Sequence, residues 1–291
     1  MRAWILAARP PTLWAAVAPV LVGSALAVSA EVFRFDAFAV VLIAAVAIQI
    51  GVNFANDLAD AERGADTEER IGPQRAVASG LISANRMRAA TAFVFGIAAG
   101  CGLYLAWLAG WVILVIGVLS ILAALGYTAG PYPYGYHGFG EVFVFVFFGL
   151  VATVGTRYVY DQTAPAEAWW CGVAMGSLAA AILVANNVRD IDTDGEAGKN
   201  TLAVKLGRRG AGRLYAGLVG GGFVVVVLAV ASDVLMLSAL LALLALPLAV
   251  RPIRVVTTET AGPPLIQALK DTARLQLAVA VLLSVGILLG A

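Results

Sequence analysis

Charged residues, histidine and cysteine are scarce in this chain. Only 13% of its 291 residues are charged, whereas soluble domains carry about 25%. Apolar residues make up 61%, which is more than a water-soluble globule of this size can bury. A soluble enzyme, a disordered chain and a nucleic-acid-binding protein are therefore excluded. The single histidine, His137, excludes a histidine-cluster metal centre, and Cys101 and Cys171 imply neither a disulfide framework nor a thiolate metal site.

Long apolar runs dominate the chain instead. A membrane-spanning helix needs about 20 mostly apolar residues. The stretches that meet this requirement lie at about 12–30, 38–56, 89–108, 110–128, 141–159, 168–188, 212–231, 233–250 and 272–290. Backbone groups in lipid must be hydrogen-bonded internally, so each run is predicted to be a helix. The sequence thus predicts an all-α, polytopic membrane bundle of about nine helices, built as one domain over residues 1–291.

Lysine and arginine are distributed unequally between the two sides of this bundle. Of the 19 basic residues, 17 fall on one side, and only Arg34 and Arg157 fall on the other. Because cytoplasmic loops are enriched in positive charge, this asymmetry predicts a cytoplasmic N-terminus and an external C-terminus. The long polar loops at about 57–88 and 189–211 then face the cytoplasm. We expect a multi-pass protein of the plasma membrane.

Acidic and amide side chains gather where two of the apolar runs reach these loops. At about 100° per residue, Asn53, Asp57 and Asp60 share one narrow helical face. Asn56 lies beside that face, and Asp66 follows in the loop. The second cluster consists of Asn186, Asp190 and Asp194, which step by four residues. The two Asn-x-x-x-Asp patterns lie 133 positions apart (53 to 186 and 57 to 190).

Carboxylates that converge at low dielectric repel each other and need a compensating cation. Oxygen ligands without histidine or cysteine favour Mg²⁺ or Ca²⁺. Asp57, Asp60, Asp190 and Asp194 are therefore the candidate metal ligands, and Asp66 is a further candidate. The alternative is a pair of solvated acidic loops, and we favour it for Glu62, Glu68, Glu69 and Glu196.

A basic residue follows each acidic cluster, as a phosphate-binding site requires. Arg75 and Lys199 are the candidates for phosphate oxygens left free by a metal. Arg70 and Arg189 fit either this role or that of ordinary cytoplasmic charges. The glycine-rich composition suits close helix packing, so it does not indicate a phosphate loop.

The segments Asn56-Asp57-x-x-Asp60 and Asp190-x-x-x-Asp194 resemble the paired aspartate motifs of the UbiA-type intramembrane prenyltransferases. Gly72-Pro73-x-Arg75 and Lys199-x-Thr201-Leu202 are similar to those members that use 1,4-dihydroxy-2-naphthoate in menaquinone synthesis. Two positions depart from the family pattern. Asp66 lies nine residues after Asp57, where many relatives have a spacing of eight, and Tyr132 stands where a basic residue is expected.

The resemblance implies a UbiA-like fold and a Mg²⁺-dependent reaction. A polyprenyl group moves from polyprenyl diphosphate to 1,4-dihydroxy-2-naphthoate, with loss of carbon dioxide and diphosphate, to give demethylmenaquinone. The loops at 57–88 and 189–211 would cap the active site. The catalytic aspartates would be the four metal candidates. The residues expected at the substrates are Asn53, Asn56, Arg70, Arg75, Asn186, Arg189, Lys199 and Tyr134.

Several alternatives remain open at this level. Aromatic residues of the 127–139 segment either stabilise an allylic cation or anchor the chain at the membrane interface. The acceptor within the family is alternatively 4-hydroxybenzoate, homogentisate, chlorophyllide, haem or a phosphoribosyl compound. Outside it, a membrane ion transporter and a CDP-alcohol phosphotransferase are considered. The acidic groups lie at helix ends rather than at the membrane midplane, which argues against transport. The expected partners are the two substrates and the lipid bilayer, with no nucleic acid.

Overall fold

The computed structural model describes residues 1–63, 75–130, 132–260 and 262–290. Within these ranges the regular structure is entirely helical. Eight helical stretches are long and apolar enough to cross a membrane. A ninth apolar helix, α5 (Trp111–Gly126), has only 16 residues. The predicted all-α bundle of about nine spans is thereby confirmed.

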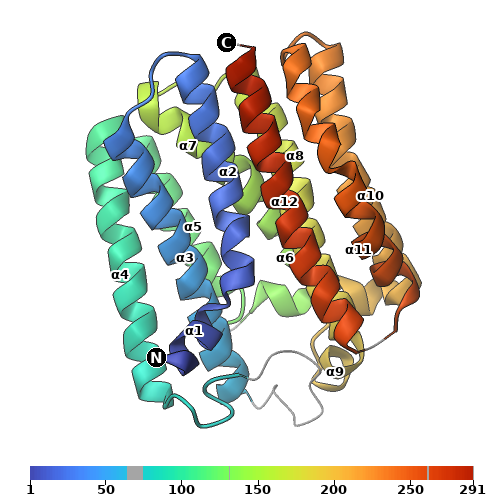
Figure 1. Ribbon diagram of the computed structural model, residues 1–291. Helices are drawn as coiled ribbons and strands as arrows, with labels where there is room; N and C mark the ends of the chain where they lie inside the picture. Colours follow the sequence, from blue (N-terminus) through green and yellow to red (C-terminus); the bar gives the residue numbers. More distant parts are fainter. Residues whose placement is uncertain (64–74, 131, 261, 291) are drawn as a thin grey trace.

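The helices follow one another with short connections. Their bounds are α1 (Arg2–Ala8), α2 (Pro10–Ser29), α3 (Phe35–Glu62), α4 (Ala84–Ala109), α5 (Trp111–Gly126), η1 (Tyr134–His137), α6 (Gly140–Val144), η2 (Phe145–Val151), α7 (Ala152–Asp161), α8 (Ala166–Arg189), α9 (Ile191–Glu196), α10 (Leu202–Ala231), η3 (Leu237–Ala245), α11 (Leu246–Thr258) and α12 (Pro263–Leu289). The chain termini lie at opposite ends of the bundle, as an odd number of crossings requires (Figure 1).

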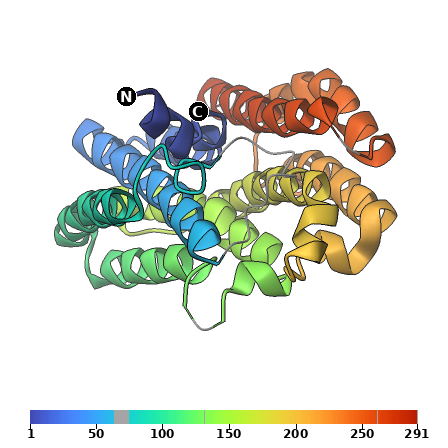
Figure 2. The same cartoon turned by 90° about the horizontal axis from the view of Figure 1, so that it is seen from below.

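The long helices run side by side and close on themselves. Helix α12 packs against α2, so the last span contacts the first full-length one (Figure 2). Helix α8 lies in the middle, in contact with α2, α7, α10, α12 and η2. Its small residues, among them Ala174, Ala181 and Ala185, are fully buried. Such residues let helix backbones approach closely, which is how spans associate where lipid removes the hydrophobic drive.

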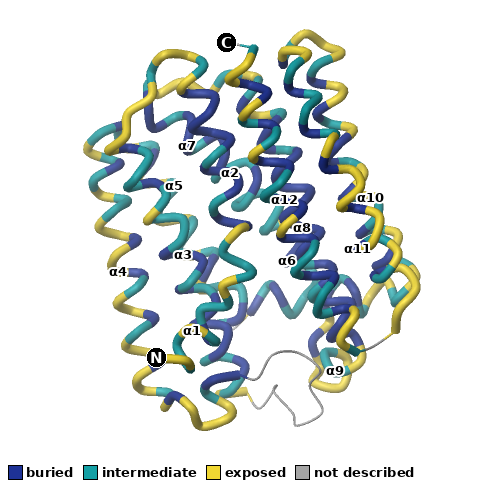
Figure 3. Tube along the Cα trace, viewed as in Figure 1, coloured by how far each residue is buried: buried dark blue, intermediate teal, exposed yellow. Residues whose placement is uncertain are grey.

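The outer faces of the bundle are apolar. Trp107, Trp111 and Leu122, on α4 and α5, are among the most exposed large side chains. Figure 3 shows the outward side of α4 as exposed, whereas α8 is largely buried. A surface of this kind would be a liability in water. In a bilayer it faces lipid tails, which agrees with a multi-pass membrane protein.

Two of the expected boundaries are displaced in ways that matter for the site. Helix α3 continues six residues past the predicted end at residue 56 and ends at Glu62. Asp57 and Asp60 therefore lie on its last turns, as the helical spacing from Asn53 predicts. In the second polar segment, expected over 189–211, α9 forms a short helix and α10 already begins at Leu202. Most of the second segment is thus helical, whereas in the first segment only its two ends, residues 57–62 and 84–88, belong to helices.

The predicted span at 141–159 contains an irregularity. Its middle, η2, is a π-helical segment between the α-helices α6 and α7. Segments of this type are rare and concentrate at functional sites. A Cβ added at Gly149 in η2 would lie 2.3 Å from Cα of Gly176 in α8. The two backbones therefore touch, and only glycine fits at this crossing.

Candidate functional site

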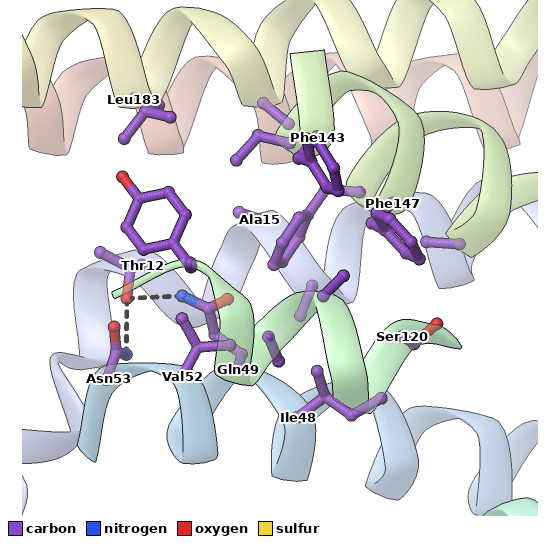
Figure 4. Close-up of a pocket in the computed structure, with 18 of the residues that line it drawn as sticks. Thr12, Ala15, Ile48, Gln49, Val52, Asn53, Ser120, Phe143, Phe147 and Leu183 are labelled. Atoms are coloured by element: carbon purple, nitrogen blue, oxygen red, sulfur yellow. Dashed lines mark hydrogen bonds between the residues drawn. The ribbon is translucent and has the colours of Figure 1, made fainter. Parts of the chain in front are cut away.

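A cavity of about 330 Å³ lies inside the bundle, between α2, α3, α5, η2 and α8. One part of its wall is polar and charged. The polar lining residues include Asn53, Asn56, Asp60, Arg75, Asn186, Asp190, Asp194 and Lys199. The rest is apolar, and Phe143 and Phe147 are among the side chains that form it (Figure 4). The cavity therefore suits a ligand with one strongly polar end and a long hydrocarbon part.

Asp60 is the centre of the polar part. It is 2% exposed and accepts hydrogen bonds from three residues that belong to three different segments. Arg75 donates through its Nη2, Lys199 Nζ lies 3.0 Å from Oδ1, and the Tyr136 hydroxyl lies 2.5 Å from the same oxygen. A buried carboxylate is retained only when it is paired and hydrogen-bonded. Asp60 meets that condition through residues far from it in sequence.

Lys199 joins the two acidic clusters. Its ammonium lies 3.0 Å from Asp60 and 3.9 Å from Oδ1 of Asp194. Asp190 lines the same cavity and is paired with Arg189, whose Nε donates over 2.7 Å. The ends of α3 and α8 therefore converge on one site, although 133 residues separate the matching Asn and Asp positions (53 to 186, 57 to 190).

Asp57 occupies a different position from its three counterparts. It is 1% exposed and is not among the residues lining the cavity. Its two carboxylate oxygens accept hydrogen bonds from the backbone N–H groups of Ala76 and Val77, at 3.0 and 2.9 Å. Asp57 thus holds the segment that presents Arg75 to Asp60. Asp57 does share a helical face with Asn53 and Asp60, but its carboxylate contacts the protein's own backbone.

The remaining predicted residues divide between the cavity wall and its supports. Asn53 donates to the Ala8 carbonyl over 2.9 Å, and Asn56 accepts from the Thr128 hydroxyl over 2.7 Å; both line the cavity. Asn186 accepts from Arg189 over 3.0 Å. Arg189 is not part of the lining, so its described contacts orient Asp190 and Asn186.

Two tyrosines, Tyr134 and Tyr136, line the cavity near its charged end. Tyr136, in η1, lies beneath two cations, with Lys199 Nζ 4.8 Å and Arg63 Cζ 5.2 Å from the ring centroid. Burial, and then the neighbouring Asp60 carboxylate, raise the pKa of Tyr136 above its usual value. The phenol therefore stays protonated and keeps donating to Asp60 at any physiological pH. Tyr134 lines the cavity, stacks on Phe143 at 3.9 Å between centroids, and donates to the Ala123 carbonyl.

Among the described ranges, no three acidic, histidine or cysteine side chains group closely enough to hold a metal unaided. Mg²⁺ however takes one or two carboxylates and completes its shell with water and substrate phosphates. The acidic side chains that line the cavity are Asp60, Asp190 and Asp194, and all three bind metals through carboxylate oxygens. This donor set fits a Mg²⁺ ion that arrives together with a diphosphate. The predicted ligand Asp66 and the predicted substrate residue Arg70 lie outside the described residues.

Some site residues were not singled out from the sequence. Arg63 donates to the carbonyls of Thr128 and Gly130, at 2.6 and 2.9 Å, and so joins the end of α3 to the segment after α5. Gln49 lines the cavity one turn before Asn53. It is the first glutamine of the chain and lies inside an apolar run. That isolation, on the face that carries Asn53 and Asp57, was the available signal.

The chain matches known proteins along most of its length. Residues 16–266 match the model of the UbiA prenyltransferase family. A 1,4-dihydroxy-2-naphthoate octaprenyltransferase from Mycobacterium leprae is 42% identical over 274 residues, which cover 92% of this chain and 90% of that protein.

Solved structures share the fold at much lower identity. A UbiA homologue from Aeropyrum pernix K1 superposes with a TM-score of 0.68 at 18% identity, covering 96% of this chain and 97% of that one. A homologue from Archaeoglobus fulgidus bound to GPP and Mg²⁺ gives 0.65 at 13% identity, covering 97% and 99%. The convergent polar cavity, the helical bundle and these matches lead to one conclusion: the chain belongs to the UbiA prenyltransferase family.

Proposed function

We propose that this protein transfers a polyprenyl group from polyprenyl diphosphate to 1,4-dihydroxy-2-naphthoate, with loss of carbon dioxide and diphosphate. The direct product is demethylmenaquinol, the reduced form of demethylmenaquinone. The observation that carries the proposal is the position of Lys199, within 4 Å of carboxylates from both acidic clusters, at the charged end of a largely apolar cavity. The M. leprae relative is named for a reaction of this class.

The charged end binds the diphosphate. Arg75 and Lys199 are 8% exposed each, and both pair with Asp60. When the C–O bond of the donor breaks, negative charge grows on the leaving diphosphate, and buried cations stabilise it more strongly than exposed ones. Mg²⁺, when bound to Asp60, Asp190 or Asp194, supplies further charge neutralisation at the leaving group. Asp57 contributes by holding the Arg75 segment.

The apolar part of the cavity holds the hydrocarbon. Departure of diphosphate leaves an allylic cation, which reacts with water unless water is excluded. Phe143 and Phe147 line the wall, and their ring faces stabilise positive charge. The ring carbon of the acceptor that bears the carboxylate then captures the cation. The bond from that carbon to the carboxylate breaks, its electron pair restores the aromatic ring, and carbon dioxide leaves. The polyprenyl chain of the donor is lipid-soluble, which explains why the site lies inside a membrane bundle.

The proposal is tested by incubating membranes that contain the protein with a labelled polyprenyl diphosphate and single acceptors. We expect product with 1,4-dihydroxy-2-naphthoate, and neither with 4-hydroxybenzoate nor with homogentisate. A chelator should abolish turnover and added Mg²⁺ should restore it. Product with 4-hydroxybenzoate alone would assign a different acceptor, and chelator-resistant turnover would contradict the role of the metal.

We also propose that the charged end of the cavity faces the cytoplasm, with the segments at 57–88 and 189–211 capping a single catalytic domain. The strong bias of lysine and arginine toward that end supports this orientation. Alkaline phosphatase fused to the C-terminus should be active, because it would lie outside, whereas a fusion after residue 80 should be inactive. The reverse pattern would overturn the orientation.

A further inference from the structure

Gln49 is a buried amide in the wall of the cavity, away from the charged end. It lies on α3, is 7% exposed and lines the cavity. Figure 4 shows it beside Thr12 and Asn53. Asp60 lies eleven residues further along α3, which corresponds to about 16 Å along the helix axis. Gln49 therefore contacts a part of the ligand space that a diphosphate held at Asp60 does not occupy.

The orientation of the Gln49 amide is determined by the hydroxyl of Thr12. Thr12 Oγ1 donates its single hydrogen to the Arg9 carbonyl over 2.9 Å. The same oxygen accepts from Gln49 Nε2 at 3.2 Å and from Asn53 Nδ2 at 3.1 Å. A hydroxyl has one hydrogen and two acceptor sites, so Thr12 is saturated. If the Gln49 amide turned over, its oxygen would face an oxygen that has no hydrogen left to donate.

This arrangement fixes the Gln49 side chain so that its carbonyl oxygen, a hydrogen-bond acceptor, faces away from Thr12. Oε1 is buried and has no hydrogen-bond partner among the described residues. A buried polar atom without a partner costs about 1–3 kcal/mol in free energy. A ligand that supplies a hydrogen-bond donor at this point removes that cost.

We infer that Gln49 Oε1 accepts a hydrogen bond from a ring hydroxyl of the aromatic acceptor and thereby selects a hydroxylated ring. The inference rests on the proposed function, whose two substrates differ in the groups that they offer. The polyprenyl chain is a hydrocarbon and has no donor. The diphosphate offers acceptor oxygens, which Gln49 Oε1 would repel. Only the dihydroxy acceptor brings O–H groups into the cavity, so it is the ligand that matches.

The test compares acceptor analogues in the wild-type protein and in Gln49→Met, which keeps the side-chain length but loses the carbonyl. The probes are 1-hydroxy-2-naphthoate and 4-hydroxy-2-naphthoate, each lacking one ring hydroxyl, used as inhibitors against 1,4-dihydroxy-2-naphthoate. In the wild type, the analogue without the recognised hydroxyl should bind about fivefold to tenfold more weakly than the parent acceptor, the usual effect of one neutral hydrogen bond. In Gln49→Met this difference should disappear, while the KM for polyprenyl diphosphate stays unchanged.

Gln276 provides a matched control. It is also fully buried, its Nε2 donates to the Met175 carbonyl over 3.2 Å, and it does not line the cavity. Gln276→Met should therefore keep the wild-type discrimination between acceptors. A second pair tests the orienting hydroxyl: Thr12→Val should weaken the discrimination and Thr12→Ser should retain it. This pair decides the matter if Gln49→Met does not fold.

The outcomes separate the inference from the proposed function. Wild-type turnover with 1,4-dihydroxy-2-naphthoate tests the function before any variant is measured, and its absence would overturn both. Suppose that the wild type turns over and that Gln49→Met discriminates between the acceptor analogues as well as the wild type does. The carbonyl oxygen then binds only water, and the inference fails while the proposed function stands. Equal losses in Gln49→Met and Gln276→Met would also overturn it, because the effect would then come from the loss of a buried amide in general.

Discussion

Lys199 Nζ and Asp60 Oδ1 lie 3.0 Å apart, although 139 residues separate them in the chain. Asp60 lies in the last turn of α3, and Lys199 lies between α9 and α10. Both side chains are about one-tenth exposed or less, so each needs buried partners of opposite charge, and this contact supplies one of them. The contact couples the integrity of the diphosphate site to the packing of helices from both halves of the chain.

Replacing Lys199 by methionine should weaken binding of the prenyl donor. The variant loses the ammonium that lies within 4 Å of both Asp60 and Asp194. We expect the KM for polyprenyl diphosphate to rise by at least about tenfold, which corresponds to roughly 1.4 kcal/mol. The KM for the acceptor should change much less. Lys270→Met is the control, because Lys270 does not line the cavity. An unchanged donor KM in Lys199→Met would contradict the assignment.

Asp57→Asn should lose both turnover and stability. The carboxylate accepts from two backbone N–H groups, and an amide has only one oxygen, so one buried donor loses its partner. This costs about 1–3 kcal/mol, and the segment carrying Arg75 becomes less ordered. Thermal unfolding in detergent and product formation are measured together. Asp192→Asn should change neither, because Asp192 is exposed and pairs with Arg208 at the surface. Full activity in Asp57→Asn would refute its role.

Tyr136→Phe should reduce turnover about tenfold to a hundredfold, since a hydrogen bond to the Asp60 carboxylate is lost and bonds to charged groups contribute about 1.5–3 kcal/mol. The raised pKa of Tyr136 has a second consequence. An unfolded tyrosine ionises near pH 10, whereas Tyr136 in the folded protein stays protonated. Above about pH 10 this ionisation stabilises the unfolded state, so the free energy of unfolding falls. The wild type should therefore lose stability on raising the pH beyond 10, and Tyr136→Phe should lose less. Identical alkaline profiles would exclude this contribution.

Gly149→Ala should prevent normal assembly of the bundle. An added Cβ would lie 2.3 Å from Gly176 Cα and 2.6 Å from the Gly172 carbonyl oxygen. Overpacking of this kind costs about 1–3 kcal/mol or more, because backbone atoms cannot move aside. Gly96→Ala is the matched control, since a Cβ there meets nothing within 4 Å. The yield of folded protein from membranes distinguishes the two. Equal yields would mean that the crossing tolerates a wider separation.

The sequence predicted the bundle, the helical face that carries Asp60 and the membrane side on which both acidic clusters lie, because these depend on local patterns. Apolar run length determines the spans, and helical spacing determines which carboxylates share a face. Asp192 falls outside the four-residue step that relates Asn186, Asp190 and Asp194, and it pairs with Arg208 over 2.9 Å.

Other features depend on contacts between distant segments, which no local pattern records. Spacing alone did not reveal that Asp57 holds the backbone at Ala76, or that Tyr136 donates to Asp60. The apolar run ends near residue 56, whereas the helix itself continues to Glu62. A polar residue on an apolar helix looks the same whether its partner is a ligand, a metal or a neighbouring peptide group.

The packing of α12 on α2 has a consequence for biogenesis. During synthesis, α2 enters the bilayer before α12. The face of α2 that packs against α12 therefore has no partner until α12 has been synthesised. Completion of the fold is therefore a late, post-insertion step. A chain that stops before residue 263, where α12 begins, leaves that face of α2 uncovered.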